Sequence, residues 1–151
     1  MEREEYMTFA LALAREAAEA GEVPVGAVIV DDEGNIVGRG RNRREERCSA
    51  IHHAEIEAIE EACRALGDWR LSGCTLYVTL EPCPMCAGAI LNARVPRLVY
   101  GAKEPVTGSC GSVLNLFEER YGFKPAIYGG ILSEECAAVM QEFFAEIRQT
   151  E

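Results

Sequence analysis

The chain has 151 residues, of which 48% are hydrophobic and 26% are charged. This length and apolar content predict a single domain over residues 1–151 with a core of its own. No run of eighteen apolar residues occurs, which excludes a membrane-spanning helix. The acidic start, Met1–Glu5, lacks the basic and apolar pattern of a secretory signal, so we expect a cytoplasmic protein.

The charge balance narrows the class of partners. Lysine and arginine total 15 against 25 acidic residues, which gives a net charge of −10. Proteins that bind nucleic acid by neutralising many phosphates are usually basic, so extensive duplex binding is disfavoured. A small recognised segment of nucleic acid remains compatible, because local charge matters more there than the total.

Hydrophobic periods typical of helices and of strands alternate along the chain, which predicts a mixed α/β domain with a five-stranded sheet between helices. In chain order, the expected elements are a helix over Glu4–Ala20, strands over Val23–Val30 and Ile36–Asn42, a helix over His53–Leu66, a strand over Thr75–Leu80, a helix over Cys83–Ala93, a strand over Arg97–Gly101, a short helix within Val113–Glu119, a strand over Ala126–Tyr128, and a last helix from Ser133 to about Arg148.

Apolar residues repeated at three- and four-residue spacing indicate two of these helices. In the first helix they are Tyr6, Phe9, Leu13, Ala17 and Ala20. In the second helix they are Ile56, Ile59, Cys63 and Leu66. In the last helix, at least one of Phe143 and Phe144 is expected in the core, and the other near the substrate or a partner subunit.

Two short motifs carry the chemistry. His53-Ala54-Glu55 opens one predicted helix, and Glu81-Pro82-Cys83-Pro84-Met85-Cys86 joins a strand to the next helix. Together they read H-x-E and P-C-x-x-C, the signature of zinc nucleobase deaminases. One imidazole and two thiolates suit Zn²⁺, and three protein ligands leave a fourth position for water. The motifs therefore predict a catalytic zinc site.

Glu55 is expected beside the zinc site as a proton carrier. Side chains at positions i and i+2 of a helix diverge, so His53 should lie at the helix start for both to reach one cavity. There Glu55 would take a proton from water and return it to the ring nitrogen and the departing amine. Two alternatives stay open: a structural zinc completed by His52 or Cys48, and an ordinary buried core.

The other cysteines and a group of arginines have less specific interpretations. In a reducing cytosol, the five cysteines outside C-x-x-C are expected to be small buried or half-buried residues. An arginine-rich segment precedes His53 and has a local charge of +3; its arginines are Arg39, Arg41, Arg43, Arg44 and Arg47. This segment either contacts phosphates or is a solvated face.

The sequence resembles the bacterial tRNA adenosine deaminases of the cytidine-deaminase-like superfamily over nearly its whole length. The resemblance is carried by the two motifs and by V-P-V-G-A-V in Val23–Val28 and T-L-E-P-C in Thr79–Cys83. It implies a three-layer α-β-α sandwich with a five-stranded mixed sheet. It also implies that adenosine at the wobble position of a tRNA anticodon loop is deaminated to inosine.

The same resemblance assigns site residues. It places His53, Cys83 and Cys86 on one Zn²⁺ per subunit and makes Glu55 the proton shuttle. The substrate-binding residues it implies are Asn42, Val25, Ala54, Leu80 and Glu104, the last at a position where the family commonly has Asp. It further implies a homodimer. The alternatives are a deaminase of a free base or nucleoside, such as guanine or cytosine, and a zinc-stabilised binding module without catalysis.

Overall fold

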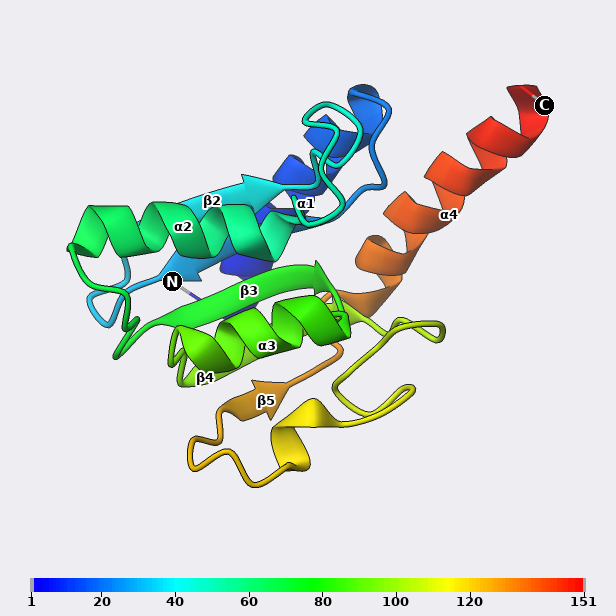
Figure 1. Cartoon of the computed structure of the whole chain (residues 1–151). Helices are drawn as coiled ribbons and strands as arrows, with labels where there is room; N and C mark the ends of the chain where they lie inside the picture. The colour runs from blue at the N-terminus through cyan, green and yellow to red at the C-terminus, as the bar shows by residue number, and fades with distance from the viewer. Residues whose placement is uncertain (1, 151) are drawn as a thin grey trace.

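The structure is a computed structural model that describes residues 2–150. Its elements (Figure 1) are α1 (Arg3–Glu19), β1 (Gly26–Val30), β2 (Ile36–Arg41), α2 (Ala54–Leu66), β3 (Thr75–Leu80), α3 (Pro84–Asn92), β4 (Arg97–Ala102), a 3-10 turn η1 (Leu116–Glu118), β5 (Ala126–Tyr128) and α4 (Ser133–Thr150). The predicted order of elements is confirmed, with ends that differ by up to three residues. Between residues 2 and 150, no helix has the length and apolar character needed to cross a bilayer.

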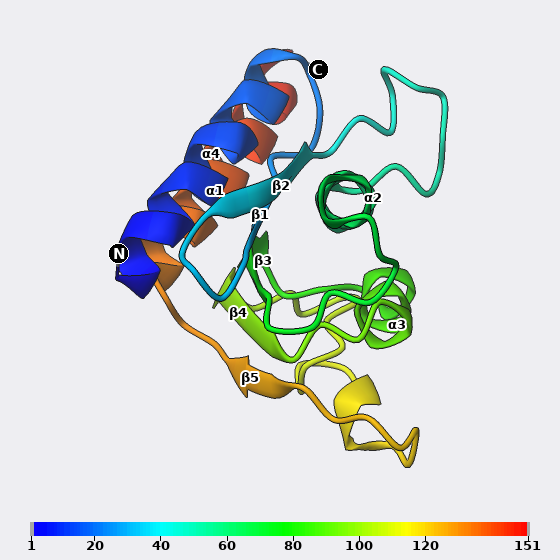
Figure 2. The ribbon, with the colours of Figure 1, turned by 90° about the vertical axis from the view of Figure 1, so that its left-hand side faces the viewer.

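The five strands form one mixed sheet in the order β2-β1-β3-β4-β5. β1 is antiparallel to both β2 and β3, whereas β3, β4 and β5 run parallel to one another. Helices α2 and α3 cover one face of the sheet and α1 and α4 cover the other (Figure 2). This is the three-layer α-β-α sandwich that the sequence predicted.

Each face of the sheet has its own hydrophobic core, because successive side chains of a strand point to opposite faces. Ala27 and Ile29 of β1 belong to the core under α2 and α3. Val28 and Val30 belong to the core shared with α1 and α4.

Glycines in the two hairpin strands let two helices lie directly on the sheet backbone. A methyl group added at Gly26 would lie 2.0 Å from the carbonyl oxygen of Ala10 in α1. One added at Gly40 would lie 2.1 Å from the Ala54 oxygen of α2, and one at Gly38 2.3 Å from that of Ala58. At these contacts there is no room for larger side chains on either the strand or the helix.

This close contact decides which residues of both helices are buried. Helix α1 buries Tyr6, Met7, Ala10, Leu11, Ala14 and Ala17, whereas Phe9 is 47% exposed. Helix α2 buries Ala54, Glu55, Ala58 and Ala62, whereas Leu66 is 41% exposed and Ile56, Ile59 and Cys63 are only half-buried. Small residues fit against the strand glycines, so the larger side chains lie to either side of the contact.

The structure contradicts the expected burial of one cysteine and of at least one of the two phenylalanines in α4. Of the five cysteines outside the motif, Cys48 is exposed, whereas the other four are buried or half-buried. Phe143 is half-buried and Phe144 is 39% exposed, so neither is part of the buried core.

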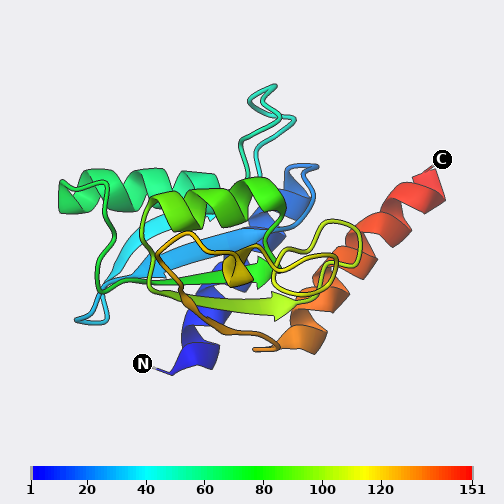
Figure 3. The ribbon, with the colours of Figure 1, turned by 60° about the horizontal axis from the view of Figure 1, so that its bottom comes forward.

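The strand ends that matter for function meet at one edge of the sheet. β2, β3 and β4 all end at this edge, and β1 begins there, with Gly26 opposite Arg41 and Leu80 opposite Ala102. The segments 42–53, 81–83 and 103–115 therefore leave the sheet at the same edge (Figure 3). In open α/β sheets, ligands bind outside the carboxyl ends of the strands.

We predict that Gly40→Ala lowers the free energy of unfolding by about 3 kcal/mol or more, because the new methyl group would displace α2 from the sheet. Gly88→Ala is the matched control, since a methyl group there meets no atom within 4 Å. It should be neutral or stabilise α3 by up to about 1 kcal/mol. Urea denaturation measures both changes, and equal midpoints for the two variants would contradict the close-packing argument.

Candidate metal centre and substrate cavity

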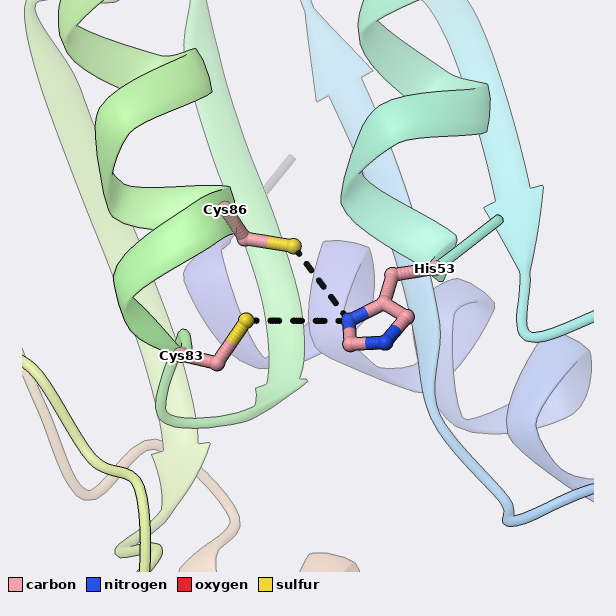
Figure 4. Close-up of side chains that lie close together, drawn as sticks. All are labelled: His53, Cys83 and Cys86. Carbon is pink, nitrogen blue, oxygen red and sulfur yellow. Dashed lines mark hydrogen bonds between the residues drawn. The ribbon is translucent and has the colours of Figure 1, made fainter. Parts of the chain in front are cut away.

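Three donor atoms meet where two helices begin. His53 immediately precedes α2, Cys83 immediately precedes α3, and Cys86 lies in the first turn of α3. The His53 Nδ1 atom lies 3.7 Å from Cys83 Sγ and 3.5 Å from Cys86 Sγ (Figure 4). Pro84 stands in the first turn of α3, where its fixed φ angle favours the start of a helix.

The spacing of these atoms suits a metal ion. A tetrahedral zinc ion with bonds of about 2.3 Å to sulfur and about 2.0 Å to nitrogen requires N···S separations of about 3.5 Å. The three ligand atoms all lie within 4.8 Å of one another. In the part of the chain that the structure describes, they form a three-ligand group of the kind found in catalytic sites.

The two candidate fourth ligands are engaged elsewhere. His52 Nε2 lies 2.8 Å from Glu57 Oε2, and the exposed Cys48 thiol donates to the carbonyl oxygen of Glu45 at 3.7 Å. Neither residue belongs to the group of donors around His53. A structural zinc closed by one of them therefore finds no support in this arrangement.

Hydrogen bonding differentiates the two thiols. The hydrogen bond from Cys86, together with that from His53, lowers the pKa of Cys83 to about 4. The hydrogen bond to Cys83 and burial raise the pKa of Cys86. The lowered pKa of Cys83 favours its thiolate form, which is the form of cysteine that binds metals.

Glu55 lies next to this group in the first turn of α2. The residue is 4% exposed, and burial is the largest cause that raises the pKa of its carboxyl group to about 7. Glu55, His53 and Cys83 line the same cavity. His53 thus takes the position at the helix start that the sequence argument required for the two side chains to reach one space.

This cavity has a volume of about 380 Å³ and opens at the strand edge. All the residues that the resemblance named for substrate binding line it: Val25, Asn42, Ala54, Leu80 and Glu104. Phe144 and Arg44 also line it. Cys86 is fully buried within α3 and reaches the centre only through its sulfur.

Sequence reasoning missed several lining residues: Val23, Glu81, Val106, Thr107 and Met140. Glu81 stands inside the recognised motif, and its acidity next to a buried strand was the one available signal. Met140 comes from α4, more than fifty residues after the motif, so no local pattern places it at the cavity.

Asn42 is held in place but retains hydrogen-bonding capacity. Its Nδ2 donates to the carbonyl oxygen of Val23 at 3.3 Å, and its Oδ1 accepts the backbone N–H of Arg44 at 3.1 Å. An amide side chain has a second N–H and a second lone pair. These are the groups with which Asn42 could contact a bound molecule.

The arginines of the arginine-rich segment lie in different environments. Arg41 and Arg43 each form a 2.9 Å ion pair with Glu46, and Arg43 forms a second one of 2.7 Å with Glu57. Their charges are therefore largely balanced within the protein. Arg44 instead lines the cavity.

A second hollow of about 430 Å³ adjoins the cavity. The two share Leu80, Glu104, Met140 and Phe144. The second hollow is also lined by two cationic residues, Lys103 and Arg148. Together the two hollows extend the binding surface from the metal centre along α4.

Comparisons with known proteins agree with this geometry. A family model described as MafB19-like deaminase matches residues 1–148. The chain is 50% identical to the tRNA-specific adenosine deaminase of Bacillus subtilis over 145 residues, which cover 95% of this chain and 89% of that protein.

Solved structures show the same fold. One comes from a study of A-to-I editing by tRNA:A34 deaminases at the wobble position of transfer RNA; it has a TM-score of 0.85 and 46% identity, and covers 89% of this chain and 98% of that one. A guanine deaminase from Nitrosomonas europaea has a TM-score of 0.84 but 26% identity, over 94% of this chain and 84% of that one.

We predict that Cys83→Ser weakens zinc binding by about tenfold or more, because a hydroxyl replaces a thiolate ligand. The half-buried Cys63, outside the donor group, provides the control variant Cys63→Ser, whose zinc content should equal that of the native protein. Elemental analysis after dialysis against a competing chelator measures both. Equal zinc retention by the two variants would remove Cys83 from the ligand set.

Proposed function

The chain belongs to the MafB19-like deaminase family and groups there with the tRNA-specific adenosine deaminases, and from this premise we propose that it deaminates adenosine to inosine at the wobble position of tRNA. The observation that carries the proposal is a three-ligand donor group beside a buried carboxyl in one open cavity. A single domain performs the reaction. Its site has a place for a metal, for a proton carrier and for a base.

His53, Cys83 and Cys86 would hold one Zn²⁺ ion per subunit. When bound, the ion supplies Lewis acidity that lowers the pKa of a water molecule toward about 7. The N···S distances of 3.5 and 3.7 Å support this assignment.

Glu55 moves the proton. Its carboxyl group lines the cavity next to His53 and Cys83 without belonging to the donor group. A carboxylate there can carry one proton from the attacking water to the ring nitrogen, and then the second proton from the same oxygen to the departing amine. Attack at C6 of adenine then releases ammonia and leaves inosine.

The cavity would bind the adenine base after it has flipped out of the stacked RNA bases. Apolar side chains of Val25, Ala54 and Leu80 line it, and the free groups of Asn42 can hydrogen-bond the nucleoside. Glu104 stands at the junction with the second hollow. That hollow, with Lys103 and Arg148, offers space and positive charge for neighbouring nucleotides.

The free-base alternative is not favoured. The fold alone does not separate the two activities, because TM-scores to a tRNA deaminase and to a guanine deaminase are 0.85 and 0.84. Identity over nearly the whole chain does separate them: it is 50% to a tRNA-specific adenosine deaminase over 95% of this chain, but 26% to one guanine deaminase over 94%. A second guanine deaminase, from Bacillus subtilis, reaches 43% identity over only 68% of this chain, with a TM-score of 0.65. A binding module without catalysis leaves the buried Glu55 beside the donor group without a role.

We predict that the zinc-loaded protein produces inosine from an anticodon stem-loop with adenosine at the wobble position, and releases no ammonia from free guanine or cytosine. Glu55→Gln should lower turnover by about 10²- to 10⁴-fold, because proton transfer is lost. Its zinc content should stay native, since Glu55 is not a ligand. Mass spectrometry of digested RNA detects inosine; ammonia from free bases alone would refute the assigned substrate.

Arg44 is the arginine that we expect to contact the RNA backbone. Arg44→Ala should weaken stem-loop binding and reduce the slope of log affinity against log salt by about 0.7, the value for one contact to single-stranded RNA. Arg39→Ala is the control, since Arg39 is exposed on β2 and does not line the cavity. Fluorescence anisotropy at several salt concentrations measures both slopes, and identical slopes would make the segment a solvated face.

We also propose that the protein is a cytoplasmic homodimer, as the resemblance implies. Two loops beside the cavity expose large apolar side chains: Ile51 at 61%, Val113 at 55% and Leu114 at 43%. A second copy would remove such surface from water, which favours association. Sedimentation equilibrium measures the mass, and a monomer at micromolar concentration would contradict the dimer.

A further inference from the structure

Besides Glu55, two buried carboxylates each accept hydrogen bonds from a loop that lines the cavity. Glu22 is 1% exposed and Glu81 is 2% exposed. Within residues 2–150, the ion pairs involve neither of them. A buried charge without an ionic partner is costly unless hydrogen bonds satisfy it. The donors that satisfy these two carboxylates come from the two loops beside the cavity.

Glu81 collects four donors from segment 103–115. Its Oε1 accepts the backbone N–H of Glu104 at 3.1 Å and the hydroxyl of Ser112. Its Oε2 accepts the backbone N–H groups of Cys110 at 2.8 Å and Ser112 at 3.2 Å. One side chain at the end of β3 therefore ties down both ends of the loop that follows β4.

The loop is closed tightly around this carboxylate. A methyl group added at Gly108 would lie 2.4 Å from the carbonyl oxygen of Glu104 and 2.5 Å from the carboxyl carbon of Glu81. The same loop lines the cavity through Glu104, Val106 and Thr107. The position of this wall therefore depends on Glu81.

Glu22 accepts hydrogen bonds from the other of these two loops. Its Oε1 accepts the backbone N–H of Glu45 at 3.0 Å, and its Oε2 accepts that of Glu46 at 2.7 Å. These residues belong to segment 42–53, which joins β2 to α2 and lines the cavity through Asn42, Arg44 and His53.

We propose that Glu22 and Glu81 are paired positioning residues, each of which fixes one wall loop so that the substrate cavity is formed before RNA arrives. The identity of the substrate in this proposal rests on the proposed function; the loop contacts do not. Because the loops are already ordered in the folded protein, RNA binding requires no further loss of loop entropy. The effect of Glu22 and Glu81 should therefore appear in substrate affinity. Glu55 lines the same cavity and would retain its chemistry.

The test uses Glu22→Gln and Glu81→Gln in the full-length, zinc-loaded protein. Glutamine has nearly the same shape as glutamate. In glutamine, however, an NH₂ donor replaces one of the two oxygens that accept hydrogen bonds from the loop. Each variant should speed amide hydrogen exchange by about tenfold or more in its own loop, 43–49 or 104–112, and leave the other loop and the zinc content native. Glu16→Gln, on the exposed surface of α1, should change neither loop.

Kinetics give the second readout. Each variant should raise KM for the anticodon stem-loop by about tenfold and change kcat by less than about threefold, because the loops hold the substrate and do not transfer protons. If Glu81→Gln fails to fold, Ser112→Ala removes one donor from the exposed side and should loosen segment 104–112 more mildly.

Three results would overturn the proposal: unchanged exchange in both loops, equal acceleration across the whole chain, or a fall in kcat with unchanged KM. Exchange and activity also separate this proposal from the proposed function. Native protein that leaves the stem-loop unmodified while each variant loosens its own loop refutes the substrate alone. An active native enzyme whose variants exchange like the native protein refutes the positioning role alone.

Discussion

The seating of α2 on the glycines of β2 is the contact on which the site depends. His53 must reach within 3.7 Å of both cysteine sulfurs, although it comes from a different helix. Its place is set where α2 begins, and α2 lies so close to the sheet that Gly38 and Gly40 could not carry a methyl group. Because packed interiors tolerate little displacement, this contact fixes the imidazole relative to α3.

Around His53 the protein places groups with different requirements for protonation. The donor group needs thiolates and a neutral imidazole to take a cation, whereas Glu55 beside it must be able to gain and lose a proton. The hydrogen bond from Cys86 lowers the pKa of Cys83 to about 4, and burial raises that of Glu55 to about 7. The same small space thus contains one group kept ionised and one that can exchange a proton.

The cavity walls are made differently from its floor. Strand ends and helix starts form the floor, and the strand backbone there is paired within the sheet. The walls are loops, and loops leave backbone N–H groups that need other partners. Glu22 and Glu81 supply acceptors for these groups from buried positions. Loops that vary in sequence on a constant scaffold let one fold accommodate different substrates, which fits the similar TM-scores to deaminases of different specificity.

The sequence by itself determined the order of elements, the donor set His53, Cys83 and Cys86, and the expectation that His53 stands at a helix start. These follow from local rules of periodicity, ligand chemistry and helix geometry, which act over a few residues. Only the tertiary structure decided which helix faces are buried, that Arg41 and Arg43 are paired while Arg44 faces the cavity, and that Met140 joins the site. The reason is that such contacts join segments far apart in the chain, and their closeness depends on how the sheet edges and helices meet.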